Sequence, residues 1–294
     1  MSVFKGAGVA IVTPMKENEE VNYDKLEELI NIQIDAGTDA IIIVGTTGEG
    51  STLTMEEHRY TIKKAVEFVK GRIPVVAGTG SNCTKTAIQL TKKAEEDGAD
   101  AALIVTPYYN KSTQEGLYQH YARIADETKL PIIMYNVPGR TGTNLLPETV
   151  ARLIKDKANI VGVKDATANM AQSSKMMYLT DGNMDLYSGE DGLVVPLLSI
   201  GAVGVISVVS DVMPKEVHEM CEYWFDGKTE EAAKLQRYLI PMVDALFCEV
   251  NPIPVKNAMN MMGLSVGPLR SPLTDLSPEH REYLKGVLKD YKLI

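Results

Sequence analysis

Eight short apolar runs, rich in valine and isoleucine, recur along the chain with helix-like segments between them. The runs are almost continuously hydrophobic and do not alternate with polar residues, which indicates parallel strands buried on both faces. The predicted strands cover residues 8–14, 40–47, 73–79, 101–107, 131–138, 160–167, 184–189 and 201–210. The intervening segments carry apolar residues at three- and four-residue spacing with charges between them, which predicts amphipathic helices. Clear examples cover residues 23–36, 55–70, 84–97, 114–128 and 170–180.

This alternation of strand and helix is compatible with a closed barrel or with a long open sheet. The repeat of roughly 25–33 residues suits an α/β fold of the (β/α)8 TIM barrel type. An open doubly wound sheet would need a glycine motif such as G-x-G-x-x-G, and no such motif begins a helix here. We therefore predict a catalytic barrel over residues 1–226. A C-terminal helical extension is predicted over residues 227–294, with helices at 228–249, 254–262 and 277–289.

The composition favours a globular enzyme and argues against several other classes. Hydrophobic residues make up 45% of the 294 residues, the formal net charge is -9, and no basic run is present. We therefore expect neither nucleic acid nor an anionic membrane as a partner. No segment reaches the roughly 20 apolar residues of a membrane span, and no signal-peptide pattern is present. A cytoplasmic location is expected.

The cysteines and histidines are scattered along the chain. Cys83, Cys221 and Cys248 form no C-x-x-C pair, so we expect reduced, mostly buried thiols and neither a disulfide nor a zinc site. A metal-dependent aldolase would need several imidazoles converging on one ion. The four histidines lie apart in helix-like segments, away from strand ends, so no metal is predicted: His58, His120, His218 and His280.

The sixth apolar run contains a lysine near its carboxyl end. Active sites of TIM barrels lie at the C-terminal ends of the strands, and Lys164 lies there between apolar residues. If its side chain points into the barrel mouth, burial lowers its pKa and frees the amine to attack a carbonyl carbon. The alternatives are a surface lysine or an ion-pair partner of Asp165. Lys111, in the loop after the fourth run, is a rival amine that is expected to be solvated.

The second run ends in the motif G-T-T-G-E, residues 45–49. Successive backbone N–H groups in such a turn form a nest for an anion, and the hydroxyls of Thr46 and Thr47 add donors. A carboxylate is the natural ligand of this nest. The alternative is an ordinary turn whose glycines only relieve backbone strain.

The fourth and fifth runs end in P-Y-Y-N, residues 107–110, and Y-N-V-P-G-R-T-G, residues 135–142. Tyr109 and Tyr135 thus lie at strand ends, where a phenol near a Schiff base can transfer protons. A tyrosine in a barrel is more often a packing residue. Arg140 offers a planar fork for a carboxylate, and its alternative is a surface salt bridge.

The seventh run ends in S-G-E-D, residues 188–191, and the eighth contains G-V-I-S, residues 204–207. Barrels that bind phosphate often do so with the loops after these two strands. The segment after the eighth run has no glycine cluster. A phosphorylated substrate, a flavin and a pyridoxal cofactor are therefore disfavoured, and no cofactor is predicted.

Taken in order along the chain, these motifs resemble those of the dihydrodipicolinate synthase family, across essentially the whole length: G-T-T-G-E, P-Y-Y-N, Y-N-V-P-G-R-T-G, G-V-K-D-A-T, S-G-E-D and G-V-I-S. This family belongs to the pyruvate-dependent class I aldolases. The resemblance implies a lyase that condenses pyruvate with L-aspartate 4-semialdehyde. The implied product is 4-hydroxy-tetrahydrodipicolinate, for lysine and diaminopimelate biosynthesis.

The resemblance also implies which residues are catalytic. Lys164 would form the imine with pyruvate, and Tyr135 would donate and accept protons. Thr46 and Tyr109 would complete a proton relay with Tyr135. Imine formation acidifies the pyruvate methyl group, so an enamine forms and its carbon attacks the aldehyde.

Four further residues are implied in substrate binding. Thr47 and its neighbouring amide would hold the pyruvate carboxylate. Arg140 would bind the carboxylate of the semialdehyde. Gly189 and Ile206 would contribute backbone contacts near the bound keto acid.

The resembled family also has a characteristic assembly. Its Tyr109 counterpart reaches across a tight dimer interface into the neighbour's site, and two such dimers usually form a homotetramer. If this carries over, a monomer of this chain is expected to be poorly active.

Inhibited members of the family have a lysine-binding site beside that interface. This chain keeps three of the matching residues: His58, Asn82 and Tyr108. It has Gly50 in place of a serine, Met55 in place of a histidine and Thr86 in place of a glutamate. Because a threonine offers no charge to the ligand's ammonium groups, weak or absent inhibition by lysine is expected.

Two rival functions remain. N-acetylneuraminate lyase and the 2-keto-3-deoxy sugar acid aldolases share the fold, the lysine and the acid–base tyrosine. Sugar-acid lyases typically have a smaller or apolar residue where this chain has Arg140, whose guanidinium suits the short semialdehyde. The second rival is a catalytically inactive barrel that binds a keto acid. The intact catalytic set argues against it: Lys164, Tyr135, Thr46 and Tyr109.

Overall fold

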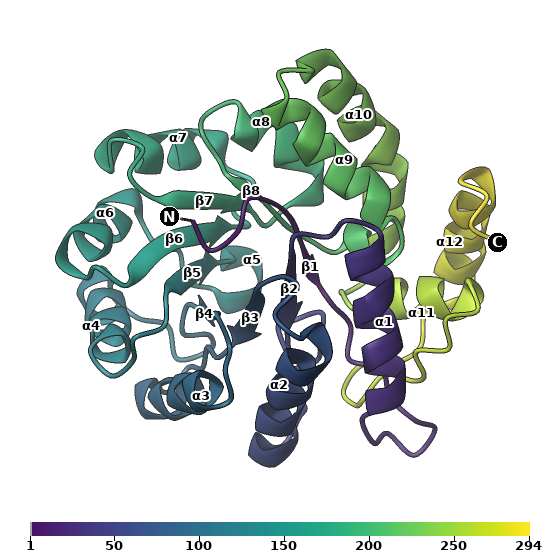
Figure 1. The fold of residues 1–294 in the computed structure, drawn as a ribbon, viewed down its shortest axis with the longest axis horizontal. Coiled ribbons are helices and arrows are strands. Elements are labelled where there is room, and N and C mark those ends of the chain that lie inside the picture. Colours follow the sequence, from purple (N-terminus) through teal and green to yellow (C-terminus); the bar gives the residue numbers. More distant parts are fainter. Residues whose placement is uncertain (1) are drawn as a thin grey trace.

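The computed structural model describes residues 2–294, and its strands form a closed barrel. Met1, where the predicted barrel domain begins, lies outside the described residues. Eight parallel strands follow one another around the barrel in chain order, and β8 pairs with β1 to complete the ring. In Figure 1 the strands lie at the centre and the helices surround them. The predicted (β/α)8 TIM barrel is confirmed.

The strands match the eight predicted runs but are shorter. They are β1 (Gly6–Ala10), β2 (Ala40–Ile43), β3 (Val75–Gly78), β4 (Ala101–Val105), β5 (Ile132–Asn136), β6 (Ile160–Asp165), β7 (Asp185–Ser188) and β8 (Gly204–Ser207). The second predicted strand extends to residue 47, but the chain leaves the sheet after Ile43. Val44 has φ 52°, a left-handed value that a strand does not accommodate. The G-T-T-G-E motif is therefore a turn outside the sheet.

Helices connect successive strands around the outside of the barrel. They are α1 (Tyr23–Asp35), α2 (Met55–Val69), α3 (Thr84–Glu96), α4 (Gln114–Ala125), α6 (Pro147–Asp156), α7 (Met170–Leu179), α8 (Val194–Leu198) and α9 (Pro214–Phe225). A single helical turn, α5 (Pro138–Thr141), follows β5. Local sequence signals start some of them: Thr54 and Glu57 form a capping box at the start of α2. The helices named from the sequence are confirmed.

A separate cluster of side chains fills the inside of the barrel. Its members are Phe4, Ala10, Ala40, Ile42, Val76, Ala101, Leu103, Ile133, Tyr135, Val137, Tyr187 and Ile206. Alternate residues of a strand share a face, so the members of each strand point inward together. In the sheet register Lys164 lies between Tyr135 of β5 and Tyr187 of β7. The Lys164 side chain therefore points into the barrel as well.

Three helices follow α9 and lie beside the barrel: α10 (Thr229–Leu246), α11 (Ile253–Met261) and α12 (Pro278–Asp290). They correspond to the three helices predicted after residue 226. Helix α10 packs against α9, beside which it lies in Figure 1. It also packs against α11 and α12. The chain around α11 returns to the barrel, where Asn251 and Lys256 contact the turn after β2.

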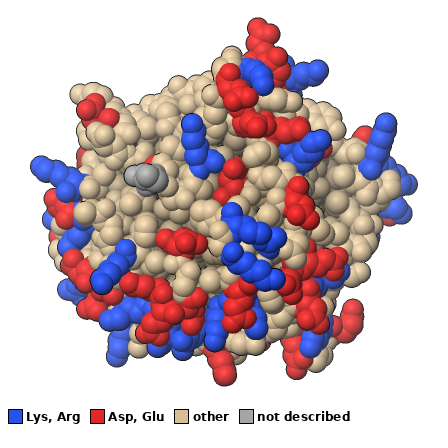
Figure 2. Space-filling view, viewed as in Figure 1, with Lys and Arg blue, Asp and Glu red and all other residues tan. Residues whose placement is uncertain are grey.

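The surface carries both signs of charge. In Figure 2 the acidic and basic side chains are interspersed, and the viewed face has no extended basic patch. Among residues 2–294, none of the helices has the length and apolar character to span a bilayer. The three cysteines are unpaired, but only Cys221 is buried. The expectation of mostly buried thiols is wrong, because Cys83 lies exposed at the start of α3 and Cys248 is half-buried.

Candidate active site

Lys164 is the centre of the candidate site. Its side chain is only 6% exposed, and its Nζ atom lies 4.5 Å from the centre of the Tyr135 ring. The Asp165 carboxylate is occupied elsewhere, because it accepts hydrogen bonds from the Thr167 N–H and, at 2.5 Å, from the Ser173 hydroxyl. Lys164 is therefore neither a surface lysine nor the partner of Asp165. The rival amine of Lys111 is exposed, as expected.

The surroundings of Lys164 favour a neutral amine. Burial lowers its pKa to about 8, the Asp191 carboxylate counteracts this effect, and the Arg140 guanidinium adds to it. At pH 7 the neutral fraction is then larger than for an ordinary exposed lysine by a factor on the order of 100. A neutral amine is the form that attacks a carbonyl carbon. Lys164 thus has the properties of a nucleophile at neutral pH.

Asp191 is a further charged neighbour of Lys164, and the sequence motifs did not predict a role for it. Its side chain is 5% exposed, and its carboxylate accepts hydrogen bonds from the N–H groups of Val208 at 2.9 Å and Val209 at 3.3 Å. Burial raises the pKa of Asp191, and Lys164 counteracts this effect. The acidic residue is visible in the S-G-E-D motif, but nothing in the motif shows that its side chain turns inward.

Gly189 leaves room for the Lys164 side chain. A Cβ atom on Gly189 would lie 3.1 Å from Lys164 Cε and 2.8 Å from Ala166 Cβ, so a larger residue would press on the lysine. Ile206 of β8 is 1% exposed and belongs to the cluster inside the barrel. Both predicted residues thus lie on strands or strand ends that face the barrel interior.

The turn after β2 places its two threonines in different surroundings. The Glu49 N–H donates to the Thr46 carbonyl oxygen at 3.1 Å, which closes the turn. Thr47 is 2% exposed, and its hydroxyl accepts a hydrogen bond from the Asn251 side chain at 3.0 Å. Thr46 is exposed and lines a cavity.

This cavity, of about 460 Å³, brings together three of the predicted residues. Its lining includes Thr46, Tyr135 and Arg140. Burial raises the pKa of the Tyr135 phenol, while Arg140 and the Thr46 hydroxyl lower it. The phenol is therefore protonated at neutral pH. Because Tyr135 lines the cavity and also lies against the Lys164 amine, it connects the two.

Tyr109 is not part of this cavity within one chain. It lies in the loop after β4, with 90% of its side chain exposed. Its φ of 71° is left-handed, which is rare for a bulky residue and indicates a constrained loop. The neighbouring Tyr108 lines the cavity instead.

Asn251 joins two of the predicted substrate-binding residues. Its carbonyl oxygen accepts a hydrogen bond from Arg140 Nη2 at 3.2 Å, and its side chain donates to the Thr47 hydroxyl. Asn251 is 5% exposed. Its role could not be predicted from the sequence, because it lies 204 residues from Thr47 and no local pattern marks it.

The groups assembled here are suited to covalent chemistry on a carbonyl compound. They are a buried amine, a protonated phenol, two hydroxyls and a guanidinium, and such a set can form an imine and transfer protons around it. Within residues 2–294, no three side chains of histidine, cysteine, aspartate or glutamate are arranged to hold a metal ion. The four histidines lie on helices α2, α4, α9 and α12.

Known proteins resemble the chain over its whole length. The profile of the Dihydrodipicolinate synthetase family matches residues 3–291. The 4-hydroxy-tetrahydrodipicolinate synthase of Lachnoclostridium phytofermentans is 53% identical over 294 residues, which cover 100% of each chain. The chloride-inhibited dihydrodipicolinate synthase of Acinetobacter baumannii, in complex with pyruvate, is 48% identical with a TM-score of 0.96 over 99% of each chain. A monomeric dihydrodipicolinate synthase variant is 45% identical, with a TM-score of 0.97 over 99% of this chain and 98% of the other.

Proposed function

The chain belongs to the dihydrodipicolinate synthetase family, and on this premise we propose how its residues condense pyruvate with L-aspartate 4-semialdehyde. The enzyme is a Schiff-base-forming lyase of the class I aldolase type. Its product is 4-hydroxy-tetrahydrodipicolinate, in lysine and diaminopimelate biosynthesis. The observation that carries the mechanism is the amine of Lys164, which is buried inside the barrel with a lowered pKa.

The neutral Lys164 amine attacks the ketone carbon of pyruvate. The resulting carbinolamine loses its hydroxyl as water and becomes an iminium ion. The positive charge acidifies the methyl group, so a proton leaves and an enamine forms. The enamine carbon bonds to the aldehyde carbon of the second substrate. The amino group of that substrate then attacks the imine carbon, which closes the ring and releases Lys164.

Tyr135 transfers the protons of these steps. Its phenol lies next to the lysine and lines the cavity, and burial keeps it protonated between transfers. Thr46 lies close enough to lower the pKa of Tyr135 and is the next member of the relay. Tyr109 would connect the relay to solvent from a neighbouring subunit.

Different residues bind the two substrate carboxylates. Thr47 and its neighbouring amide hold the pyruvate carboxylate, with backbone contacts from Gly189 and Ile206. Arg140 binds the carboxylate of the semialdehyde, as a planar guanidinium can with two parallel hydrogen bonds. Asn251 keeps Thr47 and Arg140 in a fixed relation, since it is hydrogen-bonded to both.

These residues fit a sister aldolase or an inactive barrel less well than they fit the synthase. A sugar-acid aldolase does not need a guanidinium in the cavity, whereas the semialdehyde carries a carboxylate for Arg140 to bind. A barrel without turnover would not need the phenol and the amine in contact. The relatives of about 50% identity that carry the synthase name support the same choice.

The proposal extends to assembly, domains and location. We expect a homotetramer of two dimers, in which the exposed Tyr109 enters the neighbour's site. The barrel of residues 1–226 would carry the catalytic residues, and the extension of residues 227–294 would support the turn after β2. A cytoplasmic enzyme is expected, because its three cysteines are unpaired and thiols stay reduced there.

Borohydride trapping tests the proposal directly. Wild-type enzyme incubated with pyruvate and borohydride is expected to gain the mass of one reduced adduct, and Lys164→Ala is expected to gain none. Turnover with aspartate semialdehyde and with N-acetylneuraminate is compared in parallel. If an adduct forms but only the sugar acid is turned over, the imine mechanism is retained and the proposed substrate is wrong. If the wild type forms no adduct, Lys164 does not form an imine and is only a buried structural lysine.

A further inference from the structure

The turn after β2 has an unusual backbone at both of its ends. Val44 and Glu49 each have φ 52°, which is uncommon for a residue other than glycine and more so for a β-branched one. Such conformations persist where surrounding contacts enforce them. Thr46 and Thr47, the two hydroxyls of the site, lie between these positions. The contacts that enforce this turn therefore determine where both hydroxyls point.

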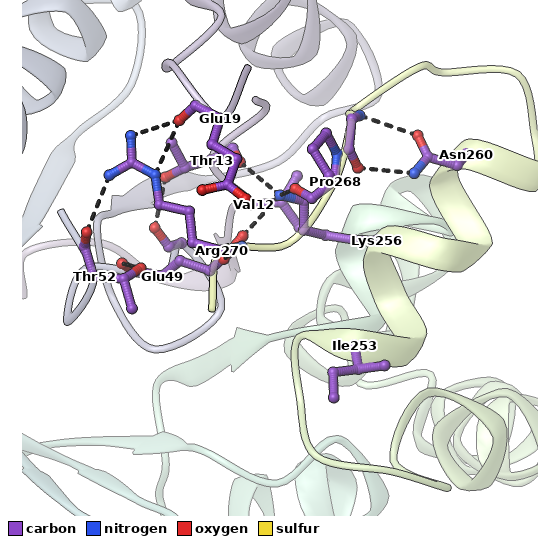
Figure 3. A network of polar contacts seen from close by, with 12 residues as sticks. Val12, Thr13, Glu19, Glu49, Thr52, Ile253, Lys256, Asn260, Pro268 and Arg270 are labelled. Atoms are coloured by element: carbon purple, nitrogen blue, oxygen red, sulfur yellow. Dashed lines mark hydrogen bonds and ion pairs between the residues drawn. The ribbon is translucent and has the colours of Figure 1, made fainter. Parts of the chain in front are cut away.

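A buried ion pair holds the carboxyl end of the turn. Lys256 Nζ lies 2.7 Å from Glu49 Oε1, and the two side chains are 1% and 0% exposed. The ammonium group also donates to the carbonyl oxygens of Thr13 at 3.2 Å and Pro268 at 2.6 Å. Each of its three hydrogens thus has an acceptor. Figure 3 shows these contacts converging on Lys256 from the barrel and from the C-terminal segment.

The other carboxylate oxygen of Glu49 is occupied as well. The Arg270 N–H donates to Glu49 Oε2 at 2.9 Å. The guanidinium of Arg270 continues outward to the Glu57 carboxylate and the Thr52 carbonyl oxygen (Figure 3 shows the latter contact). The Glu49 carboxylate is therefore fixed on two sides by residues more than 200 positions away in sequence.

Single hydrogen bonds connect the segments that carry Glu49 and Lys256 to Thr46 and Thr47. The Glu49 N–H donates to the Thr46 carbonyl oxygen at 3.1 Å, so the position of Glu49 sets the closure of the turn. Asn251 precedes α11, which carries Lys256, and donates to the Thr47 hydroxyl at 3.0 Å. We propose that Glu49 and Lys256 are positioning residues, which aim the Thr46 hydroxyl at Tyr135 and the Thr47 hydroxyl at the carboxylate of the bound keto acid. This inference rests on the function proposed for those two threonines.

A role in stability alone is the alternative. Buried ion pairs often contribute little net stability, because removing two charges from water offsets their attraction. A stability role would lower the melting temperature of variants and leave the kinetic constants of the folded enzyme unchanged. A positioning role predicts a different result, a higher KM for pyruvate together with a lower kcat.

The test is steady-state kinetics of Glu49→Gln with pyruvate varied. Glutamine keeps the shape and an acceptor for the Arg270 N–H, but it removes the charge opposite Lys256. We expect KM for pyruvate to rise about tenfold and kcat to fall about tenfold, because small displacements of active-site groups cause losses of this size. Glu57→Gln is the matched control, because it makes the same change at the other carboxylate of the network, outside the turn. In Glu57→Gln, both KM for pyruvate and kcat are expected to stay within about twofold of the wild-type values.

A double variant guards against loss of the fold. Glu49→Gln combined with Lys256→Met leaves no lone buried charge, so we expect it to melt above the single variant. Its kcat/KM for pyruvate is still expected to lie at least about tenfold below the wild type. If neither variant folds, Glu49→Asp, which keeps the charge and retracts the carboxylate, is judged by the same criterion.

The outcomes separate the positioning role from the proposed function. Wild-type constants in a folded variant at Glu49 would overturn the positioning role, as would an equal rise in KM for Glu57→Gln. Either result leaves the proposed function intact if the wild type condenses its substrates. A wild type that traps no pyruvate rejects the proposed function itself.

Discussion

Lys164 and Asp191 influence each other's charge inside the barrel. Burial lowers the pKa of the amine to about 8, and the Asp191 carboxylate prevents a larger decrease. Asp191 accepts hydrogen bonds from the N–H groups of Val208 and Val209, and the Ser207 side chain also lowers its pKa, but none of these contacts involves Lys164. Its effect on Lys164 is therefore electrostatic, and an uncharged side chain of the same shape would remove it.

We predict that Asp191→Asn shifts the pH dependence of imine formation to lower pH. The amide oxygen can still accept the backbone hydrogen bonds, but the charge that raises the pKa of Lys164 is gone. Below pH 7 the neutral fraction of the amine, and with it the rate of borohydride trapping, should be about three- to tenfold higher than in the wild type. The measurement is the trapping rate at low pyruvate from pH 6 to pH 9.5.

Glu190→Gln is the control for this prediction. Glu190 adjoins Asp191 and raises the pKa of Tyr135, but it is not among the charges that act on Lys164. Its trapping profile should keep the wild-type midpoint. A midpoint that stays the same or moves to higher pH in Asp191→Asn would show that Asp191 does not set the charge of the amine.

At the scale of elements, one side of the cavity is built from the turn after β2 and the first turns of α2 and α3. Gly50, Met55 and Thr86 all line the cavity there. A Cβ atom on Gly50 would lie 2.1 Å from the Val44 carbonyl oxygen, so a serine at this position would force the turn to move. These elements thus present an apolar methionine and a neutral hydroxyl where a lysine ligand would need charged partners.

We predict that free L-lysine is a weak inhibitor or none. Its two ammonium groups find no carboxylate at position 86, and charge-assisted hydrogen bonds are the strong ones for such a ligand. Initial rates measured with increasing L-lysine should remain within about twofold of the uninhibited rate at millimolar concentrations. Thr86→Glu offers a carboxylate and should bind lysine more tightly by calorimetry. A sub-millimolar inhibition constant for the wild type would refute the prediction.

At the scale of the whole molecule, the barrel could be predicted because each strand is marked by its own apolar run. Thr46, Tyr135 and Lys164 could be predicted to converge, since the carboxyl ends of barrel strands meet at one mouth. Asn251 and Lys256 could not, because their partners in the turn lie 204 and 207 residues away. No periodicity encodes such contacts. The ends of the strands could not be predicted either where backbone angles, and not a loss of hydrophobicity, end the strand pairing.

Tyr109 raises the question of how many chains make one site. Within a single chain its side chain is 90% exposed and does not line the cavity. Its left-handed backbone holds it in a constrained loop, and constrained loops cluster at functional sites. Tyrosine is enriched at protein interfaces, so a contact of this side chain with a partner is consistent with its exposure. A second copy of the chain is the partner that the proposed assembly supplies.

We predict that two inactive variants restore activity when their subunits are mixed. Tyr109→Phe lacks the relay hydroxyl, and Lys164→Ala lacks the nucleophile, so each alone should turn over less than about 1% of the wild-type rate. In a mixed dimer, one site combines Lys164 from one subunit with Tyr109 from the other. Random reassembly makes about half of the dimers mixed, and one of their two sites complete, so about a quarter of the wild-type activity should return.

Mixing without subunit exchange is the control, and it should restore nothing. Recovery after exchange requires that the two side chains come from different subunits, because neither chain carries both. If the exchanged mixture stays inactive although mass spectrometry shows mixed dimers, Tyr109 acts in its own chain. In that case its exposed position would have to be explained by a loop movement on substrate binding, and the site would be complete in one subunit.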